Sequence, residues 1–171
     1  EPGRMYTTDA LTLTKLGNEY VRELGQGLMW RPVMDGDIVA GPMERLFKEQ
    51  TERRVEILAG CTEDEFISDY PPAVLKEGIS EEEYKRLTDE IRSDSNDYAD
   101  IRQRFAYTDR AESLYLYSRL KAAAILADIK DMAAANAACG NKTYVYQFCK
   151  HTSDPKDLYR SPHSAELPYL F

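Results

Sequence analysis

The two strand-like segments of this 171-residue chain lie far apart, and helical sequence fills most of the space between them. VEILAG, at 55–60, is a short apolar run that ends in glycine, and TYVYQF, at 143–148, is rich in aromatic and β-branched residues. Strands that are separated by helices favour parallel pairing, because a parallel pair needs a long crossover connection. The sequence therefore predicts an α/β fold, although two strands are too few to form such a sheet alone.

Three segments carry helix signals. The first is amphipathic, with a cap expected within residues 7–9, a stop at Gly25 or Gly27, and four apolar residues on one face: Leu13, Leu16, Tyr20 and Leu24. Ser80 and Glu83 have the spacing of a capping box and predict a second helix. A long alanine-rich helix is expected over 109–135. Residues 76–135 are thus predicted to form a helical subdomain.

Composition excludes several classes of function. The chain is 43% hydrophobic, which is enough apolar surface for a packed globular unit. Its net charge is −8 and no cluster of lysine and arginine interrupts this acidic balance, which argues against a nucleic-acid partner. No apolar run approaches the roughly 20 residues needed to span a bilayer, which argues against a membrane partner. We expect a cytoplasmic protein, with secretion as the alternative.

The three cysteines, Cys61, Cys139 and Cys149, contain no Cys-x-x-Cys pair and have no histidine at ligand spacing. This pattern argues against a zinc site, and no metal or organic cofactor is expected. A disulfide between Cys139 and Cys149 could close the turn between a helix and a strand. Free thiols are the main expectation.

Ionisable side chains follow both predicted strands. Glu63, Asp64 and Glu65 come directly after the first strand, and His163 lies on a loop some fifteen residues beyond the second. The carboxyl ends of parallel strands meet at one edge of a sheet, where ligands and catalytic groups collect. A carboxylate bonded to one ring nitrogen of a histidine prepares the other nitrogen to accept a proton. From the residues alone, a solvated acidic turn and a structural histidine remain the alternative.

Four segments, taken in order, resemble landmarks of the type-B carboxylesterases, the family of para-nitrobenzyl esterases and cholinesterases. They are RPVMDGDIVAGP at 31–42, VEILAGCTEDEF at 55–66, TYVYQF at 143–148 and SPHSAELPYLF at 161–171. The resemblance covers nearly the whole chain. It implies that residues 1–171 are the carboxyl-terminal part of a single α/β-hydrolase catalytic domain.

The resemblance implies roles for individual residues. Glu65 falls at the position of the triad acid and His163 at that of the general base. Asp64 is then a structural residue of the turn, although the residues alone leave it open as the acid, and Glu166 is a structural carboxylate. Phe66 departs from the family pattern, which usually has glycine after the acid.

Leu28 and Trp30 precede the Pro-Val-x-Asp-Gly loop, where the family lines its acyl pocket. The resemblance makes them candidates for substrate contact, and packing in the core is an equal alternative.

The function implied is hydrolysis of a small-molecule carboxylic ester by a Ser-Glu-His triad. The family's nucleophile sits in a Gly-x-Ser-x-Gly turn, and every serine of this sequence lacks that flanking glycine pair. We therefore expect the nucleophile and oxyanion hole in a preceding part of the fold, and an inactive chain in their absence. That part, or a second copy, is the expected protein partner. The alternative is a noncatalytic binding protein similar to the cholinesterase-like adhesion proteins.

Overall fold

The computed structural model describes residues 6–23, 34–41, 45–46, 49, 55–93, 95–151, 154 and 156–170. The chain divides into two compact units, Glu1–Met43 and Glu44–Phe171. The prediction of a single hydrolase domain stays a prediction.

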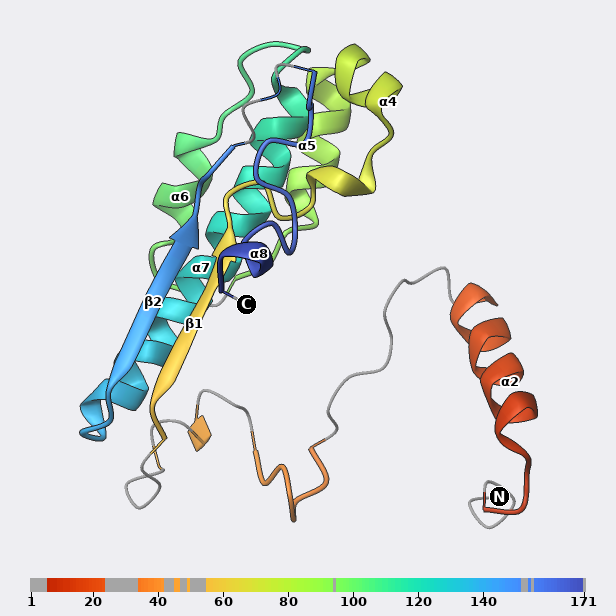
Figure 1. The fold of residues 1–171 in the computed structure, drawn as a ribbon, viewed down its shortest axis with the longest axis vertical. Coiled ribbons are helices and arrows are strands. Elements are labelled where there is room, and N and C mark those ends of the chain that lie inside the picture. Colours follow the sequence, from red (N-terminus) through yellow and green to blue (C-terminus); the bar gives the residue numbers. More distant parts are fainter. Residues whose placement is uncertain are drawn as a thin grey trace. The chain divides into compact units, whose positions relative to one another are not determined.

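The first unit contains helix α2, Ala10–Glu23 (Figure 1). Asp9 caps this helix, because its carboxylate accepts a hydrogen bond from the backbone N–H of Thr12 at 3.0 Å. The predicted start is therefore confirmed. No residue of α2 is buried, and the predicted stop at Gly25 or Gly27 lies outside the described residues.

Residues 34–41 of the same unit form a loop around an aspartate. The Asp35 carboxylate accepts hydrogen bonds from the backbone N–H groups of Asp37 and Val39, each at 3.0 Å. Gly36 has a φ of 81°, in the left-handed region that glycine adopts without steric cost. Residues 34–41 contain no strand.

The second unit is built on two parallel strands, β1 at Ile57–Thr62 and β2 at Thr143–Phe148 (Figure 1). The pairing starts with Ile57 opposite Thr143 and ends with Thr62 opposite Phe148. This parallel sheet with helical crossover confirms the predicted α/β class, as a partial fold. The bounds of β2 match the prediction, whereas β1 lies two residues later than predicted, because its partner strand continues opposite Cys61 and Thr62.

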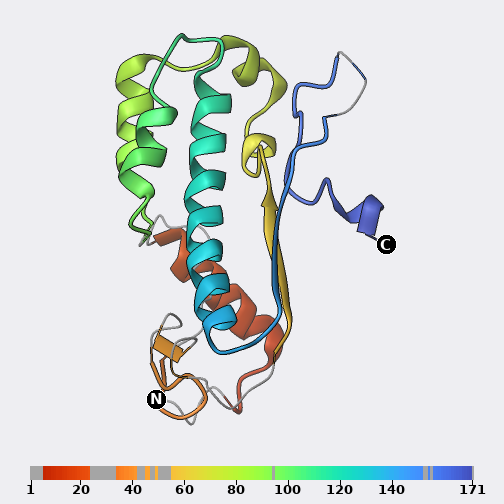
Figure 2. The ribbon, with the colours of Figure 1, turned by 90° about the vertical axis from the view of Figure 1, so that its left-hand side faces the viewer.

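Helix α7, Ser113–Ala138, packs between the sheet and the other helices (Figure 2). On one side Ala122 and Leu126 contact Cys61 of β1, and on the opposite side Leu120 packs against Tyr84. A helix that is buried on two sides must be apolar around most of its circumference, which its alanines provide. It begins four residues later than predicted, after a turn in which the Asp109 carboxylate accepts from the N–H of Glu112.

The remaining helices of this unit are short. They include the 3-10 turn η1 at Ile67–Asp69, α4 at Pro72–Glu77, α5 at Glu81–Asp89, α6 at Tyr98–Arg104 and α8 at Leu167–Leu170. At the start of α5, Ser80 accepts from the backbone N–H of Glu83 at 3.2 Å, as the predicted capping box requires. The Glu83 carboxylate instead bonds Arg86.

The cysteines are free thiols, as mainly expected. Cys61 is 5% exposed, and burial raises the pKa of its thiol to about 11. Within the described ranges, no helix is both long enough and apolar enough to cross a lipid bilayer.

Gly60 provides a test of the strand pairing. A Cβ at this position would lie 2.2 Å from the carbonyl oxygen of Tyr146 on β2, too close for either strand to stay in place. We expect Gly60→Ala to lower the free energy of unfolding by about 1–3 kcal/mol, as overpacked sites do. Gln147→Ala, at an exposed position of β2, is the control and should change it by about 0.5 kcal/mol. Urea denaturation measures both, and equal effects would contradict the register.

Candidate active site

The acid turn, residues 63–66, begins where β1 ends. The N–H of Glu63 donates to the carbonyl of Phe148 at 2.9 Å and so extends the ladder by one bond. The chain then folds back, so that the amide and the hydroxyl of Thr62 both donate to Oε2 of Glu65, at 2.8 and 2.7 Å. These two bonds fix the orientation of the Glu65 carboxylate, whose side chain is 13% exposed.

His163 reaches Glu65 from a turn that follows β2. Its Nδ1 forms a hydrogen bond with Oε1 of Glu65, a residue 98 positions earlier in the sequence. An ionised carboxylate only accepts hydrogen bonds, so Nδ1 carries the proton and Nε2 holds the lone pair. The His163 side chain is 69% exposed, and none of the described residues hydrogen-bonds to Nε2. Ser164, the next residue, has a φ of 66°, a left-handed conformation that turns the chain here.

The two groups shift each other's pKa in opposite directions. Burial disfavours the charge of Glu65, but the hydrogen bonds from His163 and Thr62 outweigh it and lower the pKa of this carboxyl. The hydrogen bond to Glu65 is the main cause that raises the pKa of His163, against a smaller effect of burial. The pair is therefore arranged to stabilise a carboxylate beside an imidazolium.

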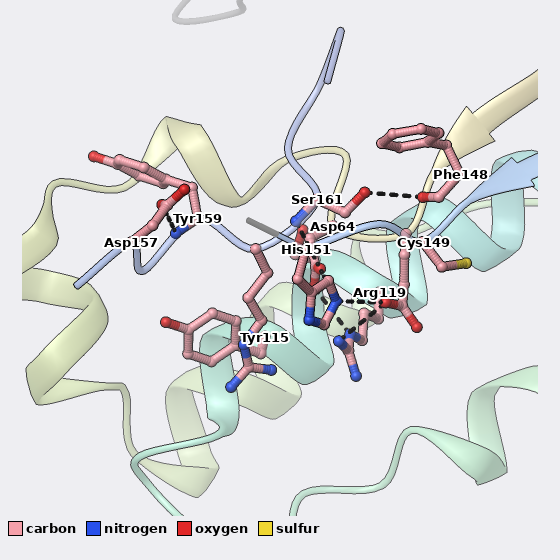
Figure 3. A network of polar contacts seen from close by, with 12 residues as sticks. Asp64, Tyr115, Arg119, Phe148, Cys149, His151, Asp157, Tyr159 and Ser161 are labelled. Carbon is pink, nitrogen blue, oxygen red and sulfur yellow. Dashed lines mark hydrogen bonds and ion pairs between the residues drawn. The ribbon is translucent and has the colours of Figure 1, made fainter. Parts of the chain in front are cut away.

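Asp64 has different partners (Figure 3). Its side chain is fully buried and accepts from Nε of Arg119 at 2.9 Å and from the backbone N–H of Ser161 at 3.3 Å. Its own N–H donates to the carbonyl of Ser161 at 3.0 Å. Of the two acids that the residues alone left open, the structure brings Glu65, not Asp64, to His163.

A second histidine lies at the same edge of the sheet, and sequence reasoning missed it. Nε2 of His151 is 3.1 Å from Oε2 of Glu63, which also accepts from Nη2 of Arg119 at 3.2 Å (Figure 3). His151 follows β2 by three residues, so the rule that located His163 could also have found it. No sequence pattern pointed to Arg119, which lies in the second turn of α7.

Glu63, Asp64 and His151 offer ligand atoms that all lie within 4.8 Å of one another. This is the spacing of a metal site. The guanidinium of Arg119 already contacts both carboxylates and compensates their charge, which disfavours a divalent cation at the same place.

The remaining candidate residues are Glu166, Phe66, Leu28 and Trp30. Glu166 accepts a hydrogen bond from the hydroxyl of Tyr146 at 3.4 Å, and its Oε2 is buried without a partner among the described residues. The ring of Phe66 lies under the ammonium of Lys121, 3.6 Å from it. Leu28 and Trp30 lie outside the described residues, so their proposed substrate contacts stay predictions.

A protein-family model described as the carboxylesterase family matches residues 5–171. The chain belongs to the carboxylesterase family. The resemblance inferred from the four sequence segments is thereby confirmed, and at the level of the family it supports an ester hydrolase. A search of curated proteins and a search of solved structures each found no significant match.

Within this carboxylesterase-family chain, the contact between Glu65 and His163 predicts a specific pH dependence of stability. The raised pKa of His163 contributes stability below the usual histidine value of 6.5, and this contribution is lost as pH rises through the folded pKa. The lowered pKa of Glu65 contributes above the usual value of 4.5 and is lost as pH falls through the folded pKa. The pair should therefore stabilise the fold most between about pH 4.5 and 6.5.

Glu65→Gln tests this contact directly. Loss of the carboxylate should lower the pKa of His163, measured by NMR titration of its ring protons. The unsubstituted chain, titrated under the same conditions, is the control. An unchanged His163 titration would show that the two side chains do not interact in solution.

Proposed function

We propose that this chain supplies the acid and the base of a Ser-Glu-His carboxylic ester hydrolase. The observation that supports the proposal is the hydrogen bond from Nδ1 of His163 to the Glu65 carboxylate. It orients the ring and leaves Nε2 as a proton acceptor, which is the preparation a general base needs. The match of the chain to the carboxylesterase family supports the same reaction class.

The mechanism proposed is acyl transfer through a covalent intermediate. The nucleophile is a serine outside these 171 residues, in the Gly-x-Ser-x-Gly turn that the family carries. Nε2 of His163 takes the proton of this serine as its oxygen attacks the ester carbonyl, and backbone N–H groups stabilise the oxyanion. His163 then returns the proton to the leaving alkoxide, and Glu65 stabilises the imidazolium in between. A water molecule then attacks the acyl-enzyme with His163 again as the base, and the carboxylic acid is released.

A noncatalytic binding role is the weaker candidate. Such a protein needs neither a Glu65 carboxylate held by Thr62 nor a histidine with an unoccupied Nε2. The expected cytoplasmic location and the expected absence of nucleic-acid and membrane partners stay predictions.

Ester turnover tests the roles of the two residues. We expect no enzymatic turnover of a para-nitrophenyl ester by the 171-residue chain alone. In a protein that carries a Gly-x-Ser-x-Gly segment ahead of this stretch, Glu65→Gln should lower kcat by roughly 10⁴ and His163→Ala by roughly 10⁶.

His151→Ala is the matched control, because it removes the other histidine–carboxylate pair at the same sheet edge. It should keep kcat near the starting value. Equal losses at His151 and His163, or esterase activity in the isolated chain, would contradict the proposed roles.

We also propose that the open side of the sheet binds the nucleophile-bearing part of the fold or, without it, a second copy of this chain. Leu58 and Tyr144 lie opposite each other on the two strands and are 65% and 59% exposed. Neither outer edge of the two strands pairs with another strand among the described residues, and such edges favour association with further strands. Light scattering during size-exclusion chromatography should show concentration-dependent self-association, and a stable monomer at all concentrations would contradict it.

A further inference from the structure

Asp64 and Ser161 join the segment that carries the acid to the segment that carries the base. They exchange two hydrogen bonds, from the N–H of Asp64 to the carbonyl of Ser161 and from the N–H of Ser161 to Oδ2 of Asp64. The hydroxyl of Ser161 also donates to the carbonyl of Phe148, at the end of β2, at 2.9 Å. Asp64 adjoins Glu65 in sequence and Ser161 is two residues before His163. Their connection therefore sets the distance between acid and base.

Arg119 holds this connection to α7. Its Nε donates to Oδ1 of Asp64 at 2.9 Å and its Nη2 donates to Glu63 at 3.2 Å, so one guanidinium spans two adjacent side chains of the acid turn. Asp64 is 0% exposed, and Arg119 itself is only 26% exposed. A fully buried carboxylate needs a charged partner, and a planar guanidinium fixes direction as well as charge.

The next residues of α7 hold the far side of the same turn. The hydroxyl of Ser118 accepts from the N–H of Phe66 at 3.2 Å, and the ammonium of Lys121 lies 3.6 Å from the centre of the Phe66 ring. Both neighbours of Glu65 are therefore anchored to one turn of a buried helix. Arg119 provides the ionic part of this anchor.

We propose that Arg119 is a positioning residue for the acid–base pair, and that it acts through Asp64 and Ser161 to hold His163 against Glu65. This inference rests on the proposed function, since it concerns the pair that would perform the reaction. Arg119 itself bonds to neither Glu65 nor His163 among the contacts of the described residues. Its effect on the pair is therefore indirect.

The direction in which the pKa of His163 changes distinguishes a positioning role of Arg119 from a direct effect of its charge. If Arg119 acted only through its positive charge, its removal would raise the pKa of His163, because a positive charge disfavours a nearby imidazolium. If Arg119 holds the ring against Glu65, its removal weakens that hydrogen bond and lowers the pKa. A role confined to folding would lower the unfolding midpoint and leave the pKa unchanged.

The experiment is an NMR titration of the 171-residue chain carrying Arg119→Met, with Glu65→Gln as the reference for complete loss of the pair. We expect Arg119→Met to lower the pKa of His163 by the larger part of the fall seen in Glu65→Gln. Because Arg119→Met leaves Asp64 buried without a charged partner, the double variant Asp64→Asn with Arg119→Met is titrated as well. The double variant removes one positive and one negative charge, so the net charge stays the same. A fall in the His163 pKa in this variant therefore shows that the ring has lost its position against Glu65.

Arg110→Met is the matched control. It removes another ion pair next to α7, from Nη2 of Arg110 to Glu77 at 3.3 Å, and should leave the His163 titration unchanged. An unchanged or raised pKa in the folded Arg119 variants, beside a lowered one in Glu65→Gln, would overturn the positioning role and leave the proposed function standing. An unchanged pKa in Glu65→Gln would instead overturn the proposed function.

Discussion

The parallel pairing of β1 and β2 is the constraint on which the site depends. With Thr62 opposite Phe148, both strands end at the same edge, and the segments that leave them start a few ångströms apart. The N–H of Glu63 and the hydroxyl of Ser161 both donate to the carbonyl of Phe148. This one carbonyl, at the end of β2, therefore connects the two segments that carry the acid and the base. A slip of the register by one residue would point the carboxylates of the acid turn to the opposite face.

Three consecutive carboxylates could not remain side by side without separate partners. Glu63 is compensated by Arg119 and His151, Asp64 by Arg119 and a backbone amide, and Glu65 by Thr62 and His163. The fully buried carboxylate, Asp64, has the closer contact with Arg119, at 2.9 Å against 3.2 Å for Glu63. Glu65 does not share this cation and is the carboxylate that bonds His163.

Much of the fold could be predicted from local patterns. The bounds of β2 follow from its aromatic and β-branched residues, the start of α2 from the capping Asp9, and the length of α7 from its alanines. Patterns along the chain did not predict Arg119 or Thr62 as partners of the acid turn. An arginine on a helix and a threonine at a strand end are common residues, and only their neighbours in space reveal what they bind.

The class of fold, the family and the two candidate residues Glu65 and His163 could all be inferred from the sequence, because strand composition, helix caps and short motifs are local properties of the chain. Only the three-dimensional arrangement shows that Glu65 bonds His163 while Asp64 bonds Arg119, and that a second histidine lies beside the first acidic residue of the turn. Those outcomes depend on the register of two strands separated by 80 positions and on the side of a buried helix that carries Arg119. Contacts over such separations arise from packing, and no local pattern encodes them.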